Sequence, residues 1–149
     1  MKKILPIFCM MLFFSAQAFP HCQIPCGIYN DDMRLDMMEE DILTIEKSMN
    51  QIDHLSSEEK KDYNQIVRWV ENKDDHADKI SDTATYYFMA QRVTPVDMKD
   101  KRGYELYARK LALLHQLVFY SMKAKQTTDI SYVDKMRVVL KEFRAAYSQ

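Results

Sequence analysis

The sequence predicts an all-α protein, an antiparallel up-and-down four-helix bundle that follows a short N-terminal segment of different character. The 149 residues fit a single domain. Only two glycines and four prolines interrupt a chain rich in helix-forming residues, which disfavours a fold built from many turns. From residue 31 onward, apolar side chains recur at steps of three and four in four separate stretches.

The first helix is expected just after residue 31, and its apolar side chains fall on one face. These are Met38, Ile42, Ile45, Met49 and Ile52. A second helix is predicted to open at Ser56, which has capping-box spacing to Glu59, and to end near Arg92. Its apolar positions are Tyr63, Ile66, Val67, Val70, Ala77, Ile80, Ala84 and Tyr87. The polar residues 71–78 interrupt this pattern, which indicates either a bend or an exposed turn.

The third helix is predicted to follow Thr94 and Pro95, a helix cap and a proline suited to the first turn. Its apolar seam is Tyr104, Tyr107, Leu111, Leu114 and Val118. The fourth helix is predicted from about Asp129, with Val133, Met136, Leu140, Phe143 and Tyr147 in the same rhythm. Core packing explains these methionine and aromatic stripes without a catalytic role. The histidines at 54, 76 and 115 share no ligand spacing and are expected at the surface or as caps.

Residues 1–20 have the pattern of a secretory signal peptide or propeptide that is cleaved. Two lysines precede an apolar run over residues 4–14, and small residues at 15–18 resemble a signal-peptidase site. The run is too short to span a bilayer comfortably, and no later stretch is long and apolar enough. We therefore expect an exported protein, periplasmic or extracellular, with no membrane span after processing.

Processing also changes the charge and the cysteine content. Loss of Lys2 and Lys3 changes the balance from 21 basic and 22 acidic residues to 19 and 22, so the net charge moves from −1 to −3. Such a chain lacks the basic character of a nucleic-acid binder. Cys9 leaves with the signal, so Cys22 and Cys26 remain. In an exported protein, two cysteines are ordinarily interpreted as a disulfide.

Residues 21–30, here called the hook, have no structural use in a bundle of residues 31–149. Pro25 prevents an ordinary helix, and Gly27 permits backbone conformations that other residues resist. We therefore expect the hook to fold back and bring Cys22 and Cys26 together.

The hook offers an unusual donor set if proteolysis makes His21 the first residue. The α-amine of His21, the deprotonated amide nitrogen of Cys22 and the thiolates of Cys22 and Cys26 can form a planar set of two nitrogens and two sulfurs. Square-planar coordination of this kind favours Ni(II) or Cu(II). The His21 imidazole could approach axially, which suits a metal that changes oxidation state, and soft thiolates would stabilise the higher state.

The pattern of the hook resembles the N-terminal nickel site of the nickel-containing superoxide dismutase family at all six fixed positions. These are His21, Cys22, Pro25, Cys26, Gly27 and Tyr29. Members of that family carry a four-helix bundle directly behind the hook, so the resemblance covers the whole mature chain. It implies a nickel-dependent enzyme that disproportionates superoxide to dioxygen and hydrogen peroxide by cycling between Ni(II) and Ni(III).

The resemblance also implies roles for individual residues and an assembly. Nickel, one ion per chain, would be held by the His21 amine and imidazole, the Cys22 amide and the two thiolates. Pro25 would follow a cis peptide bond, and Tyr29 would order water beside the open axial face. Asp36 is the best candidate for the acidic residue that steadies the histidine, with Glu39 as an alternative. Tyr87 resembles a second tyrosine near the site, Lys73 is a candidate basic residue, and the assembly would be a homohexamer.

Exposure of His21 requires a second cleavage. Signal peptidase acting after Ala18 would leave Phe19 and Pro20 in front of His21, which would then lack a free amine. We expect an X-Pro dipeptidyl peptidase or a dedicated maturation protease to remove them. Two alternatives stay open from the residues alone. They are a non-catalytic exported bundle that binds copper or nickel through the hook, and an interaction module whose hook is closed by a disulfide.

Overall fold

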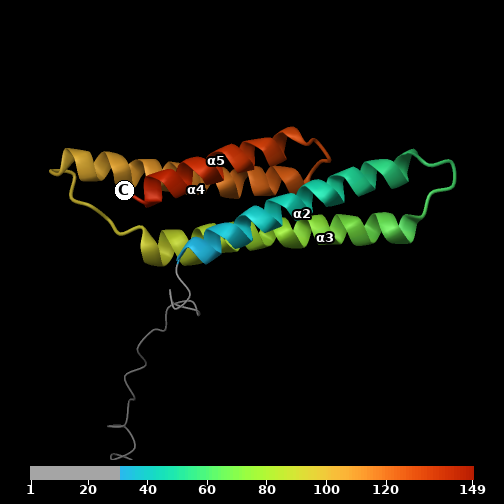
Figure 1. Cartoon of the computed structure of the whole chain (residues 1–149), viewed down its shortest axis with the longest axis horizontal. Helices are drawn as coiled ribbons and strands as arrows, with labels where there is room; N and C mark the ends of the chain where they lie inside the picture. Colours follow the sequence, from blue (N-terminus) through green and yellow to red (C-terminus); the bar gives the residue numbers. More distant parts are fainter. Residues whose placement is uncertain (1–30) are drawn as a thin grey trace, which may run out of the picture.

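The computed structural model describes residues 31–149, which fold as four antiparallel helical segments (Figure 1). The elements are α2 (Asp31–Ser57), α3 (Tyr63–Asp82), η1 (Thr83–Arg92), α4 (Lys101–Lys125) and α5 (Ser131–Tyr147). The π-helical segment η1 continues α3, so both belong to one segment of the bundle. The predicted four-helix bundle is confirmed. The predicted signal peptide and the hook lie outside the described residues.

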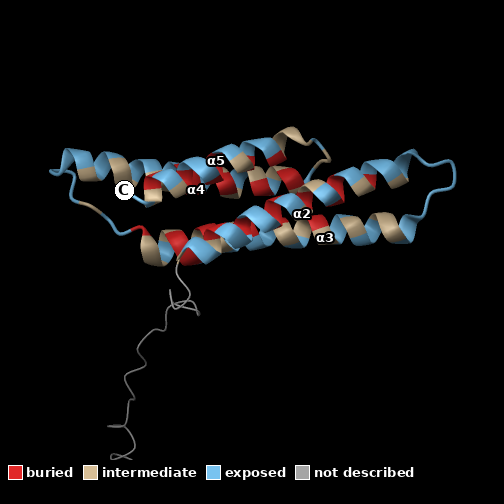
Figure 2. Cartoon of the chain, viewed as in Figure 1, coloured by how far each residue is buried: buried red, intermediate tan, exposed pale blue. Residues whose placement is uncertain are grey.

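The core lies between the four segments and contains most of the predicted apolar stripes (Figure 2). On α2, all five predicted core residues are buried, and on α5 all but the partly buried Tyr147 are. The buried face of α4 differs from the predicted one. Tyr104 is exposed, whereas Leu113, Leu117 and Ala124, which were not predicted, are buried. None of the helices in the part that the structure describes is both long and apolar enough to cross a membrane.

The predicted start of the second helix at Ser56 is wrong. α2 continues to Ser57, and α3 begins only at Tyr63, after Asp62. The carboxylate of Asp62 accepts a hydrogen bond from the backbone N–H of Gln65 at 3.1 Å, which is the geometry of a helix N-cap. Ser56 has the right spacing to a glutamate but lies in a helix that has not yet ended.

The predicted start of the third helix near Thr94 is also wrong, because α4 begins at Lys101 with Asp100 as its cap. The Asp100 carboxylate accepts from the backbone N–H of Gly103 at 3.0 Å. A Cβ at Gly103 would collide with that carboxylate, so the glycine leaves room for the cap. Thr94 and Pro95 lie in the preceding loop.

Two predictions for α3 are wrong, namely the interruption at residues 71–78 and the packing of Tyr63, Val67 and Val70 in the core. The polar residues 71–78 form neither a bend nor a turn, because α3 runs through them with Lys73 and Ala77 buried. Tyr63, Val67 and Val70 are exposed, at 71%, 54% and 36% respectively. The α2–α3 hairpin extends past the α4–α5 pair at this end, so fewer neighbours cover α3 there (Figure 1).

Candidate metal centre

The residues predicted to bind the metal all precede the described part of the chain. Outside the described residues lie the ligands His21, Cys22 and Cys26, the geometry residues Pro25 and Gly27, and the catalytic candidate Tyr29. Their roles stay predictions. Within residues 31–149, no three His, Cys, Asp or Glu side chains gather closely enough to hold a metal ion. The three cysteines of the sequence all precede residue 31, so intramolecular thiolate ligands must come from that part.

Chain connectivity limits how far the hook can reach from the bundle. Asp31 is the first residue of α2, and Cys26 precedes it by five residues. A fully extended chain advances at most about 3.6 Å per residue, so the Cα atoms of Cys26 and Asp31 are within roughly 18 Å of each other. The surroundings of Asp31 are therefore the part of the bundle nearest the predicted ligands along the chain.

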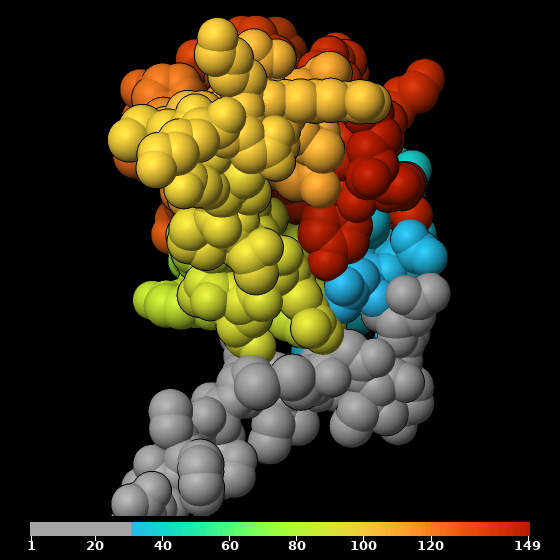
Figure 3. All heavy atoms as spheres, turned by 90° about the vertical axis from the view of Figure 1, so that its left-hand side faces the viewer, coloured from blue at the N-terminus to red at the C-terminus, as the bar shows by residue number. Residues whose placement is uncertain are grey.

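Three elements meet at Asp31, where the last turn of α5 lies against the first turn of α2 (Figure 3). The phenol of Tyr87 donates to Oδ1 of Asp31 at 2.5 Å, and the phenol of Tyr147 donates to Oδ2 at 2.6 Å. Arg92 Nε lies 3.2 Å from Oδ1, and its Nη2 donates to the Tyr87 hydroxyl at 3.1 Å. These four residues are called the Asp31 cluster below.

The π-helical geometry of η1 explains how Tyr87 and Arg92 reach the same carboxylate. The backbone N–H of Val93 donates to the carbonyl oxygen of Phe88 at 2.9 Å, a bond that spans five residues. In an α-helix, residues five apart point in directions about 140° apart. The wider turn brings the side chains at 87 and 92 onto one face, and both then point toward α2.

Aromatic packing holds the two tyrosine rings of the cluster in place. The ring of the fully buried Phe88 contacts Tyr87 at 5.2 Å, Phe143 at 5.0 Å and Tyr147 at 5.4 Å between centroids, each nearly edge to face. The guanidinium of Arg34 lies 4.9 Å from the Tyr87 ring centroid. The hydroxyl groups that meet Asp31 are therefore carried by rings with little freedom to move.

The cluster keeps Asp31 ionised. Burial alone would raise the pKa of Asp31, but hydrogen bonds from Tyr147 and Tyr87 and the charge of Arg92 together lower it. Burial and the Asp31 carboxylate raise the pKa of Tyr147, so its phenol remains a donor. Near neutral pH the cluster thus combines one carboxylate, one guanidinium and a protonated Tyr147.

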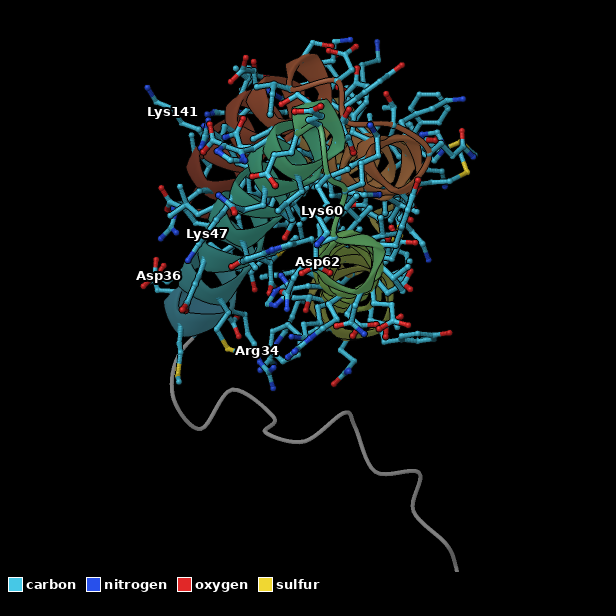
Figure 4. The ribbon with its side chains drawn as sticks, turned by 90° about the vertical axis from the view of Figure 1, so that its right-hand side faces the viewer. Arg34, Asp36, Lys47, Lys60, Asp62 and Lys141 are labelled. Carbon is cyan, nitrogen blue, oxygen red and sulfur yellow. The ribbon has the colours of Figure 1, made fainter. Side chains whose placement is uncertain are left out.

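Asp36, predicted to steady the His21 imidazole, lies on α2 beyond the first turn and pairs with α5. Its Oδ1 accepts from Arg144 Nη2 at 2.6 Å, and Glu39, the alternative, lies 3.8 Å from the same nitrogen. The Asp36 side chain is 67% exposed. Arg34 and Asp36 leave α2 in different directions (Figure 4). A role toward His21 stays a prediction for both acidic residues, whereas Tyr87 lies in the Asp31 cluster.

Lys73 is distant from this end of the bundle. The neighbouring Asn72 donates to Ser48 at 2.9 Å, and Ser48 lies about 25 Å along α2 from Asp31. The Lys73 ammonium donates to the carbonyl oxygens of Ala124 and Lys125, both at 2.8 Å. It binds the C-terminal end of α4, which has unpaired carbonyls and a negative dipole end. This placement favours a structural role over the candidate role at the metal.

Sequence reasoning missed two partly buried polar residues that join helices, His76 and Asp31. His76 was expected at the surface, but its Nδ1 lies 2.6 Å from Oδ1 of the buried Asp41, beside a cavity of about 470 Å³. Asp31 was not predicted to take part in a site. Neither residue has a local signal, because Asp41 and His76 are 35 residues apart and Asp31 and Tyr147 are 116 apart. Only the packing of the helices brings these pairs together.

Comparison with known proteins gives one match. Residues 15–149 match the family model described as nickel-containing superoxide dismutase. No curated protein and no solved structure matches the chain. The matched range includes the complete hook and all four helical segments of the bundle. On this evidence, the chain belongs to the nickel-containing superoxide dismutase family, which is a family of oxidoreductases.

Proposed function

We propose that this protein is a nickel-dependent superoxide dismutase that uses one nickel ion per chain, held in the hook. The observation that carries the proposal is the family match over residues 15–149, which includes every fixed position of the hook pattern. Two superoxide anions and two protons give one dioxygen and one hydrogen peroxide. One superoxide loses an electron and the other gains it, so the reaction needs no external reductant.

The donor set of the hook fits nickel. Cys22 and Cys26 would supply thiolates, and the His21 amine and the Cys22 amide would supply nitrogens, a combination that suits square-planar Ni(II). Nickel held there would supply one-electron chemistry between Ni(II) and Ni(III). The His21 imidazole is proposed as a further ligand to the metal, and Pro25 and Gly27 would shape the turn. Tyr29 would order water and restrict access to small anions.

The bundle would contribute the support of the hook. Tyr87 is proposed as the second tyrosine near the metal, and its phenol is already held by Asp31 and Arg92. Asp36 is proposed to steady His21. Its pairing with Arg144 leaves a carboxylate oxygen available for a further hydrogen bond, since a carboxylate accepts several.

The N-terminal pattern supports a proposal for maturation and location. We propose that signal peptidase removes residues 1–18 and that a second protease removes Phe19 and Pro20, which frees the amine of His21. The protein would then act in the periplasm or outside the cell, as a homohexamer. Protein that starts at Phe19 and is fully active would contradict the amine ligand.

Substitution of the ligands tests the proposal. Cys22→Ser and Cys26→Ser are expected to lose both nickel and activity, whereas His21→Ala should keep some nickel and lose most turnover. The matched control is Cys9→Ser in the precursor, which removes the third cysteine without touching the hook and should mature to a fully active enzyme. Full activity with retained nickel in either hook cysteine variant would contradict the assignment. Metal binding without turnover in the wild type would instead indicate the non-catalytic metal-binding alternative.

A further inference from the structure

We propose that the Asp31 cluster fixes the junction between the hook and the bundle, and that Asp31, Arg92 and Tyr147 are therefore positioning residues for the metal centre. The junction is the peptide bond that joins residue 30 to Asp31. This inference rests on the proposed nickel function, because it concerns how firmly the chain holds the metal-binding segment. It assigns no contact to the metal or to superoxide.

The interactions of Asp31 exceed what a helix start requires. An acidic residue in the first turn of a helix is stabilised by the helix dipole while facing water. The Asp31 carboxylate instead accepts hydrogen bonds from Tyr87 of η1 and Tyr147 of α5 and pairs with Arg92 of η1. First turns of helices fray easily because their N–H groups lack partners within the helix. Fixing the first side chain of α2 to two other elements opposes that fraying at the junction.

The partners of Asp31 are themselves rigid. Tyr87 is 1% exposed, and both tyrosine rings pack edge to face on the buried Phe88. Arg92 reaches the carboxylate because η1 places it on the face of Tyr87. A carboxylate that is held by fixed donors has few alternative orientations, so the direction in which α2 starts is well defined.

The position of the junction matters for metal binding because Cys26 is only five residues away. Metal sites require ligands held within about 0.5 Å of the productive geometry by well-packed supporting residues. Weakening the cluster would widen the range of positions open to the hook relative to Tyr87. We therefore expect nickel to leave faster, even though no ligand has changed.

The test uses the full processed protein with its nickel and compares three conservative variants. Tyr147→Phe removes one hydrogen bond to Asp31 and keeps the ring. Tyr132→Phe is the matched control, because its ring also packs against the core and its hydroxyl makes no hydrogen bond within residues 31–149. Ile52→Val controls for general destabilisation, since Ile52 is buried on α2 about 30 Å from Asp31.

Two readouts are measured on each protein. The first is the rate of nickel transfer to a chelator, and we expect Tyr147→Phe to raise it about 10- to 150-fold, which corresponds to the loss of one hydrogen bond to a charged group. The second is amide hydrogen exchange in the second turn of α2 in nickel-free protein, whose N–H groups bond to the carbonyl oxygens of the first turn and should therefore exchange faster in the same variant. Both controls should keep wild-type values for both readouts.

The outcomes separate this inference from the proposed function. Wild-type rates of nickel transfer and exchange in Tyr147→Phe would overturn the positioning role while leaving a nickel enzyme intact. Equal acceleration in Ile52→Val would also overturn it, because global stability would then explain the effect. Absence of nickel from correctly processed wild-type protein would contradict the proposed function itself, and the exchange readout would still decide whether the cluster fixes the first turn.

Discussion

Two carboxylates on α2 show how burial and partners compete at the scale of single residues. Both Asp31 and Asp41 are largely withdrawn from water, which disfavours the charged form. At Asp31, the phenols and the guanidinium outweigh that cost and lower the pKa. At Asp41, burial dominates over the hydrogen bond with His76 and the pKa is raised. The balance between the depth of burial and the number and charge of the partners thus decides which carboxylate remains an acceptor in acid.

Asp31 is predicted to make the bundle more stable above about pH 4 than below it. The pKa in the folded state lies below the ordinary value of about 3.9, so this contribution is present above that value and is lost as the pH falls through the folded pKa. Asp31→Asn should lower the free energy of unfolding at pH 7 by about 1–3 kcal/mol. Urea unfolding of wild type and Asp31→Asn between pH 2 and 7 measures this difference in the free energy of unfolding.

The difference between wild type and Asp31→Asn should shrink toward pH 2, because the wild-type carboxylate is then protonated as well. Asp53→Asn is a suitable control, since Asp53 lies on the same helix and is exposed. A difference that stays constant from pH 2 to 7 would contradict the linkage.

At the scale of elements, periodicity predicted the existence and inner faces of the helices better than their ends. The residues of α2 and α5 that recur at steps of three and four are buried because each helix packs on others along one face. Helix ends depend on which of several possible caps is used. Asp62 and Asp100 cap α3 and α4 by accepting N–H bonds, and Ser56 and Thr94 had equally good local patterns.

Long-range geometry could not be predicted from the sequence. The polar residues 71–78 look like a break, yet Lys73 is buried because the end of α4 offers it carbonyl oxygens. The π-helical turn of η1 and the pairing of Asp31 with Tyr147 have no local signal either. The hook is the opposite case, because its six fixed residues lie within nine positions and predict the metal site from the sequence alone.

Replacing Lys73 is predicted to destabilise the bundle without changing the nickel content. Its three N–H donors are matched by Asp74, Ala124 and Lys125, so Lys73→Met would leave buried carbonyl oxygens without a partner. We expect a loss of about 1–3 kcal/mol in the free energy of unfolding. Urea unfolding of metal-free protein measures it. Lys60→Met, in the exposed loop after α2, should change stability little. Equal effects of the two substitutions would contradict the capping role.

The whole molecule has two different ends. At one end, the start of α2, η1 and the end of α5 meet around Asp31, next to the hook in the chain. At the other end, the α2–α3 hairpin extends past its neighbours (Figure 1). Tyr63, Val67 and Val70 of α3 are exposed there. Exposed apolar surface of this kind is available for association between chains.

We predict that the processed protein is a homohexamer and that the exposed face of α3 contributes to its assembly. Val67→Lys would place a charge on that face and should shift the assembly toward smaller species, because burying an unpaired charge is costly. Light scattering coupled to size-exclusion chromatography measures the mass. Val138→Lys, at a similarly exposed site on α5, serves for comparison. A wild type that is monomeric at micromolar concentration would contradict the assembly, and an unchanged mass in Val67→Lys would exclude the α3 face.

The most direct test of the central claim combines three measurements on one sample of protein purified from a host that exports it. Intact mass gives the first residue, metal analysis gives the nickel content, and a superoxide dismutase assay gives the activity. The account predicts a chain that starts at His21, about one nickel per chain as in the proposed site, and activity that is lost when nickel is removed and regained when it is restored. A correctly processed chain that carries a Cys22–Cys26 disulfide and no nickel, in the presence of available nickel, would contradict it.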